Sequence, residues 1–369
     1  MIVAVFYGII PIAGGFFSRY RWKKFRNRFD FLRLSPLLDY RRYRQLKKEG
    51  GVFRFTGEIE SISDETLWVR GETLTIPVSL KKTKCFVLPI HEEEGVPEPP
   101  EQIRWNRVST ITEGAKVFIG GKIKDENDRL NFCSTKENPL MVIFYDCPDT
   151  ELTSAIIRAS RTRNEYWNSI TPISIVIGAL ALIYIAASFL NRPAFRLTVI
   201  SALAAAFVPI LPVFPPGFLL TTFYRSMTWE ARKLRAYWDL VRLPLRHLHP
   251  GQESGTLCSG EKYGYVKTDS FPQTEETIPM LLPEISGEGK KSQHYFFGVI
   301  EENSVLPKKP KDPFISFGVL PADPSTLARR YAVRSYLLEA LAWLVLVTGI
   351  FINIVFIFLI LFLLGVVSF

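Results

Sequence analysis

The sequence has few cysteines, few histidines and little charge for its length. Of 369 residues, four are cysteine and four are histidine, and 22% are Asp, Glu, Lys or Arg. So few cysteines exclude a disulfide-rich secreted scaffold, whose small domains depend on many cross-links. A hydrophobic fraction of 47% excludes a disordered chain, which needs low hydrophobicity. The mean hydropathy of +0.12 with a pI near 9.3 instead indicates a membrane protein with substantial soluble parts.

The sequence also lacks the short motifs that commonly mark enzymes. It has no phosphate-binding loop, dinucleotide fingerprint, nucleophile elbow, zincin helix or Cys-x-x-Cys pair. The best candidate metal ligands are His247, His249 and Cys258, and Cys258 could also act as a nucleophile beside His249 or His294. Solvated histidines and an ordinary loop thiol account for the same residues. We therefore predict no catalytic residue, no cofactor and no metal site.

Four long segments carry no charged side chain, and a helix needs about 20 apolar residues to cross a bilayer. We therefore predict an α-helical transmembrane part of four spans. The uncharged segments are residues 1–18, 170–190, 197–224 and 340–369. The last is expected to belong to one helix over residues 323–369, because Asp323-Pro324 combines a capping residue with proline at the first helical position.

The third segment, 197–224, is interrupted by prolines between Pro209 and Pro216. A proline removes a backbone hydrogen bond and clashes with the preceding turn. In a membrane, the freed carbonyls need another partner. We predict a proline-kinked crossing, and a re-entrant element is the alternative.

The net charge of +9 is concentrated in one segment. Residues 19–49 contain 12 Lys and Arg against three acids, which equals the whole excess of the chain. A cleaved signal peptide carries its basic region before the apolar run, whereas here the basic run follows it. We predict an uncleaved anchor at 1–18 and a basic juxtamembrane segment at 19–49, with a helix starting at Ser35-Pro36.

Basic residues flank the same side of all four predicted spans, and the other side offers only Arg192 and Arg196. The positive-inside rule then places both soluble regions in the cytoplasm and both termini outside, and we expect a bacterial cytoplasmic membrane. Anionic headgroups of the bilayer are the expected partner of the flanks. The predicted membrane-flank residues are Arg19, Arg21, Lys23, Lys24, Arg232, Lys233, Arg235, Arg329 and Arg330.

Residues 50–148 contain short runs of β-branched and aromatic residues separated by turns, which predicts a β-rich, barrel-like domain. Gly120-Gly121 within one run indicates a bulge or the bend that closes a barrel, and a small OB-like Greek-key barrel is the expected fold. Trp68, Arg70, Phe118, Lys122, Lys124 and Phe132 could bind a nucleic acid strand. The region has 12 basic and 16 acidic residues, and this negative balance disfavours nucleic acid as a partner. We expect a solvated loop at 91–102.

The remaining segments connect these parts. We predict an amphipathic connector helix at 149–169, a basic amphipathic interfacial helix at 225–249, and a small irregular β domain at 250–322. The interfacial helix has a mixed aromatic and basic composition over 228–241, and packing against the β domain is its alternative.

The sequence favours a non-enzymatic, membrane-tethered scaffold or partner-binding protein, with a protein partner bound through residues 50–148. Two alternatives stay open. A transporter or channel subunit would use the proline-broken third span, although no ionisable group lies within any span and Asn353 is the one strongly polar side chain in the last. A membrane-bound enzyme would use Cys258 or the histidine pair. The sequence leaves the oligomeric state undetermined.

Overall fold

A computed structural model of the chain has two compact units. Unit 1 consists of Met1–Lys23, Asn164–Leu234 and Ala332–Phe369, and unit 2 consists of Lys24–Arg163 and Arg235–Tyr331. The structure describes residues 1–45, 49–63, 65–81, 83–88, 100–104, 108, 111–126, 129–162, 165–166, 168–213, 217–248, 252–257, 259–269, 293–301, 304 and 306–363.

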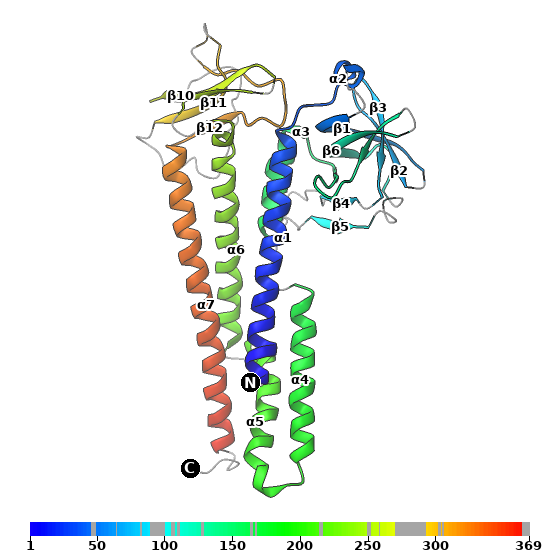
Figure 1. Cartoon of the computed structure of the whole chain (residues 1–369). Coiled ribbons are helices and arrows are strands. Elements are labelled where there is room, and N and C mark those ends of the chain that lie inside the picture. The colour runs from blue at the N-terminus through cyan, green and yellow to red at the C-terminus, as the bar shows by residue number, and fades with distance from the viewer. Residues whose placement is uncertain are drawn as a thin grey trace. The chain divides into compact units, whose positions relative to one another are not determined.

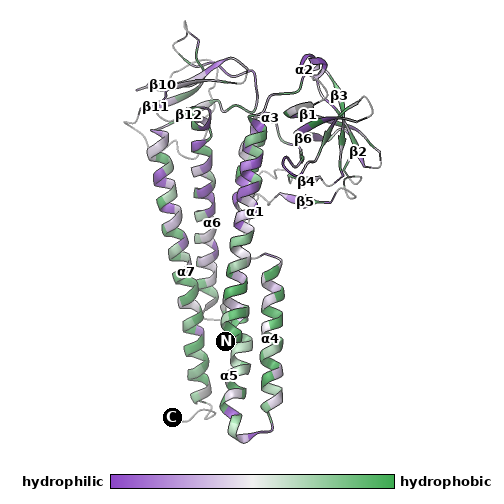
Figure 2. Cartoon of the chain, in the orientation of Figure 1, coloured by the Kyte–Doolittle hydropathy of each residue, from purple (hydrophilic) through white to green (hydrophobic). Residues whose placement is uncertain are grey.

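Unit 1 is helical. Three of its helices, α1, α6 and α7, continue without a break into unit 2, and each has a hydrophobic part and a hydrophilic part (Figures 1 and 2). The helices that contribute to unit 1 are the π-helical turn η1 (Ala4–Ile9), α1 (Ile10–Arg33), α4 (Ile170–Phe189), η3 (Pro193–Phe195), α5 (Arg196–Phe207), η4 (Val208–Val213), α6 (Gly217–Arg242) and α7 (Pro324–Leu363).

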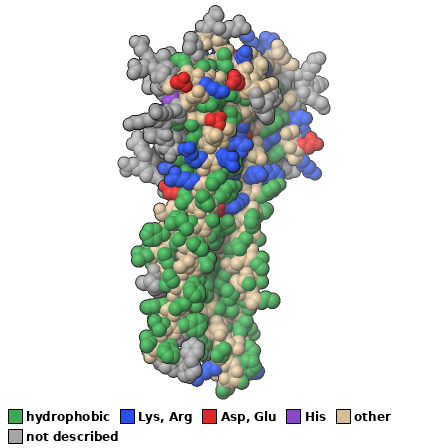
Figure 3. All heavy atoms as spheres, turned by 90° about the vertical axis from the view of Figure 1, so that its left-hand side faces the viewer, with side chains coloured by type: hydrophobic (Ala, Val, Ile, Leu, Met, Phe, Trp, Pro, Cys, Tyr) green, Lys and Arg blue, Asp and Glu red, His purple; other side chains and the backbone are tan. Residues whose placement is uncertain are grey.

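Among the described residues, three helical stretches are long and apolar enough to cross a membrane. They are Ile170–Phe189, Pro193–Leu211 and Pro324–Ile360. On the face shown in Figure 3, hydrophobic side chains cover the long helices, and most of the Lys and Arg side chains gather towards one end. Many apolar side chains of unit 1 are exposed, such as Leu180, Leu219 and Leu344. This distribution indicates membrane association, since a water-soluble protein rarely exposes so large an apolar surface.

Two predicted boundaries fall inside continuous helices. Helix α1 runs through Ser18 to Arg33, and α6 runs through Tyr224 to Arg242, so neither basic segment starts a separate element. The helix predicted to lie in the headgroup layer is the second half of α6. Its apolar side chains Leu234, Tyr237 and Leu240 are buried within the protein, so this face of the helix packs against other residues, and its location in the headgroup layer stays a prediction.

The helix predicted to begin at Ser35-Pro36 begins later. The Pro36 carbonyl accepts a hydrogen bond from Arg54 N, and Leu38 N donates to the Arg54 carbonyl, so this stretch extends alongside a strand. Helix α2 (Tyr40–Gln45) follows Asp39, whose carboxylate accepts a hydrogen bond from Arg42 N at 2.7 Å. A carboxylate in this position caps a helix N-terminus, and that local bond sets where α2 begins.

Unit 2 contains one large sheet and one small sheet. The large sheet has the order β1-β2-β3-β7-β6-β8-β4-β5, and β1 also pairs with β6, so five strands form a closed ring. The pairs β3–β7 and β4–β8 are parallel, and the other pairs are antiparallel. The strands are β1 (Glu49–Ser63), β2 (Thr66–Arg70), β3 (Thr75–Ser79), β4 (Lys84–Val87), β5 (Glu101–Ile103), β6 (Lys116–Glu126), β7 (Arg129–Cys133) and β8 (Met141–Tyr145).

Strand β6 changes its neighbour at Gly120-Gly121. Its first half pairs with β8 up to Gly120, and its second half pairs with β7 from Lys122 onward. The ladder with β1 keeps its register there, so the glycines mark close packing and not a bulge. A Cβ atom on Gly121 would lie 2.5 Å from Leu140 Cδ1, and one on Gly120 would lie 2.7 Å from Leu32 Cδ1, closer than real contacts allow.

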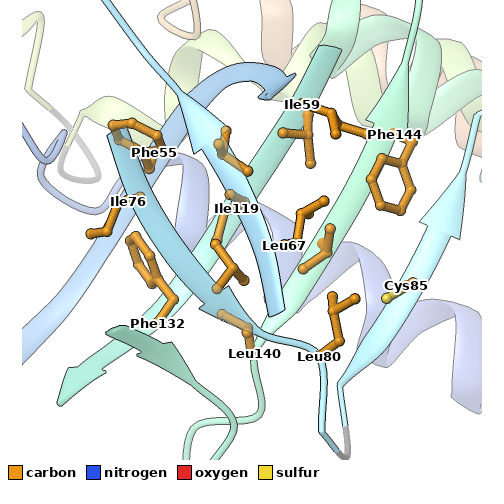
Figure 4. Close-up of a cluster of buried hydrophobic side chains, with 14 of the residues drawn as sticks. Phe55, Ile59, Leu67, Ile76, Leu80, Cys85, Ile119, Phe132, Leu140 and Phe144 are labelled. Carbon is orange, nitrogen blue, oxygen red and sulfur yellow. The ribbon is translucent and has the colours of Figure 1, made fainter. Parts of the chain in front are cut away.

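Alternate side chains of the ring strands fill its interior (Figure 4). Phe55, Leu67, Ile76, Ile119 and Phe132 come from five different strands, and each is at most 3% exposed. Burying one such side chain stabilises the fold by about 1.5–3 kcal/mol. The ring is therefore a packed core and not an open channel.

The small sheet has four antiparallel strands in the order β12-β11-β10-β9. They are β9 (Ser254–Thr256), β10 (Lys262–Thr268), β11 (His294–Val299) and β12 (Gly318–Leu320), and unit 2 also includes α3 (Asp149–Thr162) and η5 (Pro244–His247). Residues 91–99 of the predicted loop lie outside the described residues, and Glu101-Gln102 belong to β5, which pairs with β4. The strand-like run at 277–285 also lies outside them.

Candidate functional site

The outer face of the barrel at β1 and β6 is covered by other parts of unit 2. Residues alternate across a strand, so Arg54 points outward between Phe53 and Phe55, and Phe118 points outward from β6. The Phe118 ring lies 5.3 Å from the ring of Phe29 on α1 and 5.5 Å from that of Phe314. This second aromatic core brings α1 and the segment 312–316 against the barrel.

Arg33, the last residue of α1, is fully buried beside this aromatic core. Its Nε donates to Asp30 Oδ1 at 3.2 Å, and Nη1 donates to the Phe314 carbonyl at 3.0 Å. Asp30 also pairs with Arg246 of η5. Burial lowers the pKa of Arg33 to about 10, which still leaves the guanidinium charged. One carboxylate thus joins arginines from two elements.

Arg54 forms the second buried cation of this site. Its Nη2 pairs with Asp312, and its guanidinium lies 5.0 Å from the centre of the Phe314 ring, a cation–π arrangement. The Arg54 side chain is 5% exposed. Arg33 and Arg54 therefore both contact Phe314, one through its carbonyl and the other through its ring.

His247 lies in the same site, on η5. Its ring is 5.0 Å from that of Tyr263, and the Tyr263 hydroxyl donates to the Ser316 carbonyl at 2.7 Å. Burial, together with the positive charges of Arg33 and Arg54, lowers the pKa of His247 to about 3. We call Asp30, Arg33, Arg54, Arg246, His247, Tyr263 and Asp312 the arginine site.

This environment is unfavourable for a metal ion bound by His247, one of the three candidate ligands named from the sequence. Two arginines influence His247 electrostatically, and a cation would be repelled by them. Within the described ranges, no group of three His, Cys, Asp or Glu side chains could hold a metal ion. His249 and Cys258, the other two candidate residues, lie outside the described residues.

The arginine site was missed at the sequence level, although weak signals point to it. Arg54 is a single cation between two phenylalanines of a strand, and Asp30 is the one acid between residues 19 and 38. Each is unusual for its segment. Their partners Asp312 and Arg246 lie more than 200 residues away, and no local pattern connects them.

A second buried network lies elsewhere in unit 2. Asp239 on α6 accepts a hydrogen bond from Arg161 Nε at 2.6 Å and pairs with Arg26 Nε at 3.8 Å. Arg26 also donates to the Ser160 carbonyl at 3.4 Å. These contacts join α1, α3 and α6. Part of the basic charge of α1 thus forms ion pairs and hydrogen bonds within the protein.

The predicted membrane-flank residues separate into two groups. Arg19, in unit 1, pairs with Glu165 and, at 2.5 Å, with Glu339 of α7, so its charge is balanced by carboxylates of the protein. The others lie exposed or partly exposed on α1, α6 and α7. Exposed are Arg21, Lys23, Lys24, Arg329 and Arg330, and partly exposed are Arg232, Lys233 and Arg235.

The barrel residues considered for nucleic acid binding include both buried and exposed side chains. Phe118 and Phe132 are fully buried, so their rings are not available for stacking on bases. Trp68 on β2 remains partly exposed, opposite Pro77 of β3, and Arg70 is exposed in an ion pair with Glu58. A partner at this face would meet one large aromatic ring with both charge signs beside it.

A side chain supplies hydrogen-bond partners for backbone groups at the break in the third predicted span. Helix α5 changes to the 3-10 turn η4, and α6 starts at Gly217, while residues 214–216 lie outside the described part. The Asn353 amide of α7 accepts a hydrogen bond from Gly217 N at 3.1 Å and donates to the Leu211 carbonyl. Asn353 is 2% exposed. Asn353 thus joins α7 to both sides of the break.

Comparison with known proteins gives no relative that could suggest a function for these residues. No protein family model, no curated protein and no solved structure matches the chain.

Proposed function

We propose that this protein is a membrane-tethered scaffold that binds a partner protein through the outer face of its barrel. The observation that carries the proposal is Trp68, a large aromatic side chain left partly exposed beside Pro77 on an otherwise well-packed barrel. Tryptophan and arginine are enriched among residues that dominate protein interfaces. Arg70 and Glu58 supply a polar rim of both signs, which suits a protein partner better than a polyanion.

The strand order supports an OB-like barrel as the binding module. Counting ring strands along the chain, the order β6-β1-β2-β3 is 4-1-2-3, the arrangement of a Greek key. A fifth strand, β7, completes the ring between β3 and β6. OB-folds bind their ligands on the face of strands 2 and 3, where Trp68 and Pro77 lie.

The packing of residues 1–18 supports a membrane crossing by this segment, the first of four. The first helix runs antiparallel to α4 for most of its length: Gly15 faces Tyr166, and Phe6 faces Ser174 and Gly178. Ile2 and Val3 pack against a buried cluster that includes Leu182 and Ala186, close to the far end of α4. An element that accompanies a spanning helix over this distance is expected to cross the same bilayer.

The contacts within unit 2 restrict the number of membrane crossings between its two sequence segments, Lys24–Arg163 and Arg235–Tyr331. Phe118 and Phe314 are in contact, so the barrel and the segment 312–316 must lie on one side of the membrane. An even number of crossings must then separate them. This favours a complete, kinked third crossing over a re-entrant element, and the basic flanks favour the cytoplasmic side of a bacterial inner membrane.

Replacing Trp68 tests the proposed function. The full-length protein carrying Trp68→Ala and the wild type would be purified from native membranes after mild cross-linking, and the cross-linked partners compared. We expect one dominant partner with the wild type, reduced roughly tenfold or more in the variant, since loss of such a residue commonly costs about 2 kcal/mol or more of binding free energy.

Tyr40→Ala provides the matched control, because Tyr40 is an aromatic residue of unit 2 that is 50% exposed and lies away from β2 and β3 in the sequence. It should keep the partner. Equal partner recovery from Trp68→Ala and wild type, or no dominant partner in either, would contradict the proposal.

The transporter alternative rests on the proline break. The hydrogen bonds of Asn353 to Gly217 and Leu211 occupy backbone groups that a substrate would otherwise use, which weakens this alternative. Solute flux in proteoliposomes that disappears when Pro209 is replaced would favour transport over the scaffold. The enzyme alternative depends on residues 249 and 258, outside the described part.

A further inference from the structure

The arginine site holds several hydrogen-bond donors without an acceptor. Within the part of the chain that the structure describes, Arg33 Nη2, Arg54 Nε and Nη1, and His247 Nε2 are buried and have no hydrogen-bond partner. The Arg33 and Arg54 residues are 1% and 4% exposed. A buried donor left unpaired costs about 1–3 kcal/mol, and more when it is charged. Such a concentration in one site calls for an acceptor.

The charges around these donors leave a positive excess. Facing groups come from every element of the site: Asp30 and Arg33 from α1, Arg54 from β1, Arg246 and His247 from η5, Tyr263 from β10, and Asp312 from the segment before β12. Three arginines oppose two carboxylates, while His247 and Tyr263 are neutral at physiological pH. The sum is one positive charge in a buried site.

The unpaired donors belong to three elements that meet beside Phe314. Arg33 ends α1, Arg54 lies in the middle of β1, and His247 lies on η5. Each of the three interacts electrostatically with the other two. Donors arriving from separate elements suit an anion whose oxygens point in several directions. A tetrahedral phosphate group meets this requirement better than a planar carboxylate, and arginine is the residue that most often binds it.

We propose that Arg33, Arg54 and His247 bind one phosphate group, carried either by a free phosphate compound or by a phospholipid headgroup. The phosphate oxygens accept hydrogen bonds from the unpaired guanidinium nitrogens, and the negative charge balances the positive excess of the site. Bound phosphate joins α1, β1 and η5, so its binding stabilises unit 2.

The test uses full-length protein in zwitterionic detergent and phosphate-free buffer. Inorganic phosphate is titrated while thermal unfolding is followed, with acetate at equal ionic strength as the anion control, and tightly bound phosphorus is measured after delipidation. Arg54→Lys keeps the charge opposite Asp312 but replaces the three nitrogens of the planar guanidinium by a single ammonium nitrogen. Arg70→Gln removes an arginine that is 64% exposed on the same barrel and serves as the control variant.

For a free phosphate compound, we expect phosphate and not acetate to raise the unfolding temperature saturably. Arg54→Lys should weaken the apparent affinity roughly tenfold or more, equivalent to about 1.4 kcal/mol, and Arg70→Gln should bind as the wild type does. For a lipid headgroup, we expect about one phosphorus atom per chain to survive delipidation in the wild type and Arg70→Gln, and to be lost in Arg54→Lys.

The proposal is overturned if added phosphate has no more effect than acetate and no phosphorus is retained. It is also overturned if Arg54→Lys binds phosphate as tightly as the wild type. If Arg54→Lys fails to fold, the wild type alone decides between binding and no binding. Its retained lipid phosphorus is assayed first, and broadening of the ³¹P signal of added inorganic phosphate is then measured on the same protein.

Discussion

At the scale of single residues, two carboxylates that are largely shielded from solvent each pair with two arginines. Asp239 contacts Arg26 and Arg161, and Asp30 contacts Arg33 and Arg246. A buried ion pair often contributes little net stability, but removing one member leaves an uncompensated charge at a cost of about 3–5 kcal/mol. These pairs therefore fix which elements meet, more than they add to stability.

His247 gives a pH dependence at this same scale. Burial and the neighbouring arginines hold its pKa near 3 in the folded protein, while an exposed histidine in the unfolded chain has a pKa of about 6.5. Below pH 6.5, the unfolded state therefore binds a proton that the folded state does not, and stability falls as the pH falls.

The expected contribution of His247 is a loss of about 1.4 kcal/mol in unfolding free energy between pH 7.5 and 5.5. Unfolding of wild type and His247→Gln at both pH values, in phosphate-free buffer, measures it. The variant should lose less stability than the wild type by about this amount. An identical pH dependence in both proteins would show that His247 is not held neutral.

Sequence reasoning at this scale found the types of residue but not their partners. The basic character of residues 19–49 was evident, and the positive-inside rule treats such a run as exposed. Arg19 instead contacts the distant carboxylate of Glu339, and Arg54 that of Asp312. Arg33 donates to the distant backbone carbonyl of Phe314. Tertiary contacts of this kind leave no periodic signal along the sequence.

At the scale of elements, the sequence predicted those helix boundaries that depend on neighbouring residues. Asp323 caps α7 by accepting a hydrogen bond from Thr326 N at 3.0 Å, as the Asp-Pro pair predicts, and the helix breaks within the proline-rich stretch. The ends of α1 and the start of α6 were not predictable from composition, because a helix can continue from an apolar into a basic sequence without any change of backbone propensity.

The break before α6 gives a prediction for Asn353. Asn353→Leu removes the amide that bonds Gly217 N and the Leu211 carbonyl, and no lipid group can replace it. We expect a loss of about 1–2 kcal/mol in unfolding free energy, measured by titration with a denaturing detergent.

Val355→Leu on the same helix is the matched control for this loss, since Val355 is 50% exposed and its replacement changes no hydrogen bond. It should unfold as the wild type does. If Asn353→Leu were as stable as Val355→Leu, the amide would not be what holds the broken segment together.

At the scale of the whole molecule, the fold of unit 2 and the apolar helices constrain each other. The barrel and the small sheet belong to one compact unit, although the chain between them contains two stretches able to cross a membrane, Ile170–Phe189 and Pro193–Leu211. Both sheets can form one unit only if that chain leaves the membrane on the side where it entered. The central claim is that this hairpin crosses twice and returns.

Site-specific labelling of single cysteines with a membrane-impermeant maleimide tests this claim most directly. In a background with the four native cysteines replaced by alanine, cysteine would be placed at Glu72 of the barrel, Glu253 beside the small sheet, and Arg192 of the turn after α4, all exposed positions. Sealed vesicles of both orientations would be compared. We predict that Glu72→Cys and Glu253→Cys label in the same vesicles and Arg192→Cys in the opposite ones. Labelling of the Glu72 and Glu253 positions from opposite sides would contradict the account.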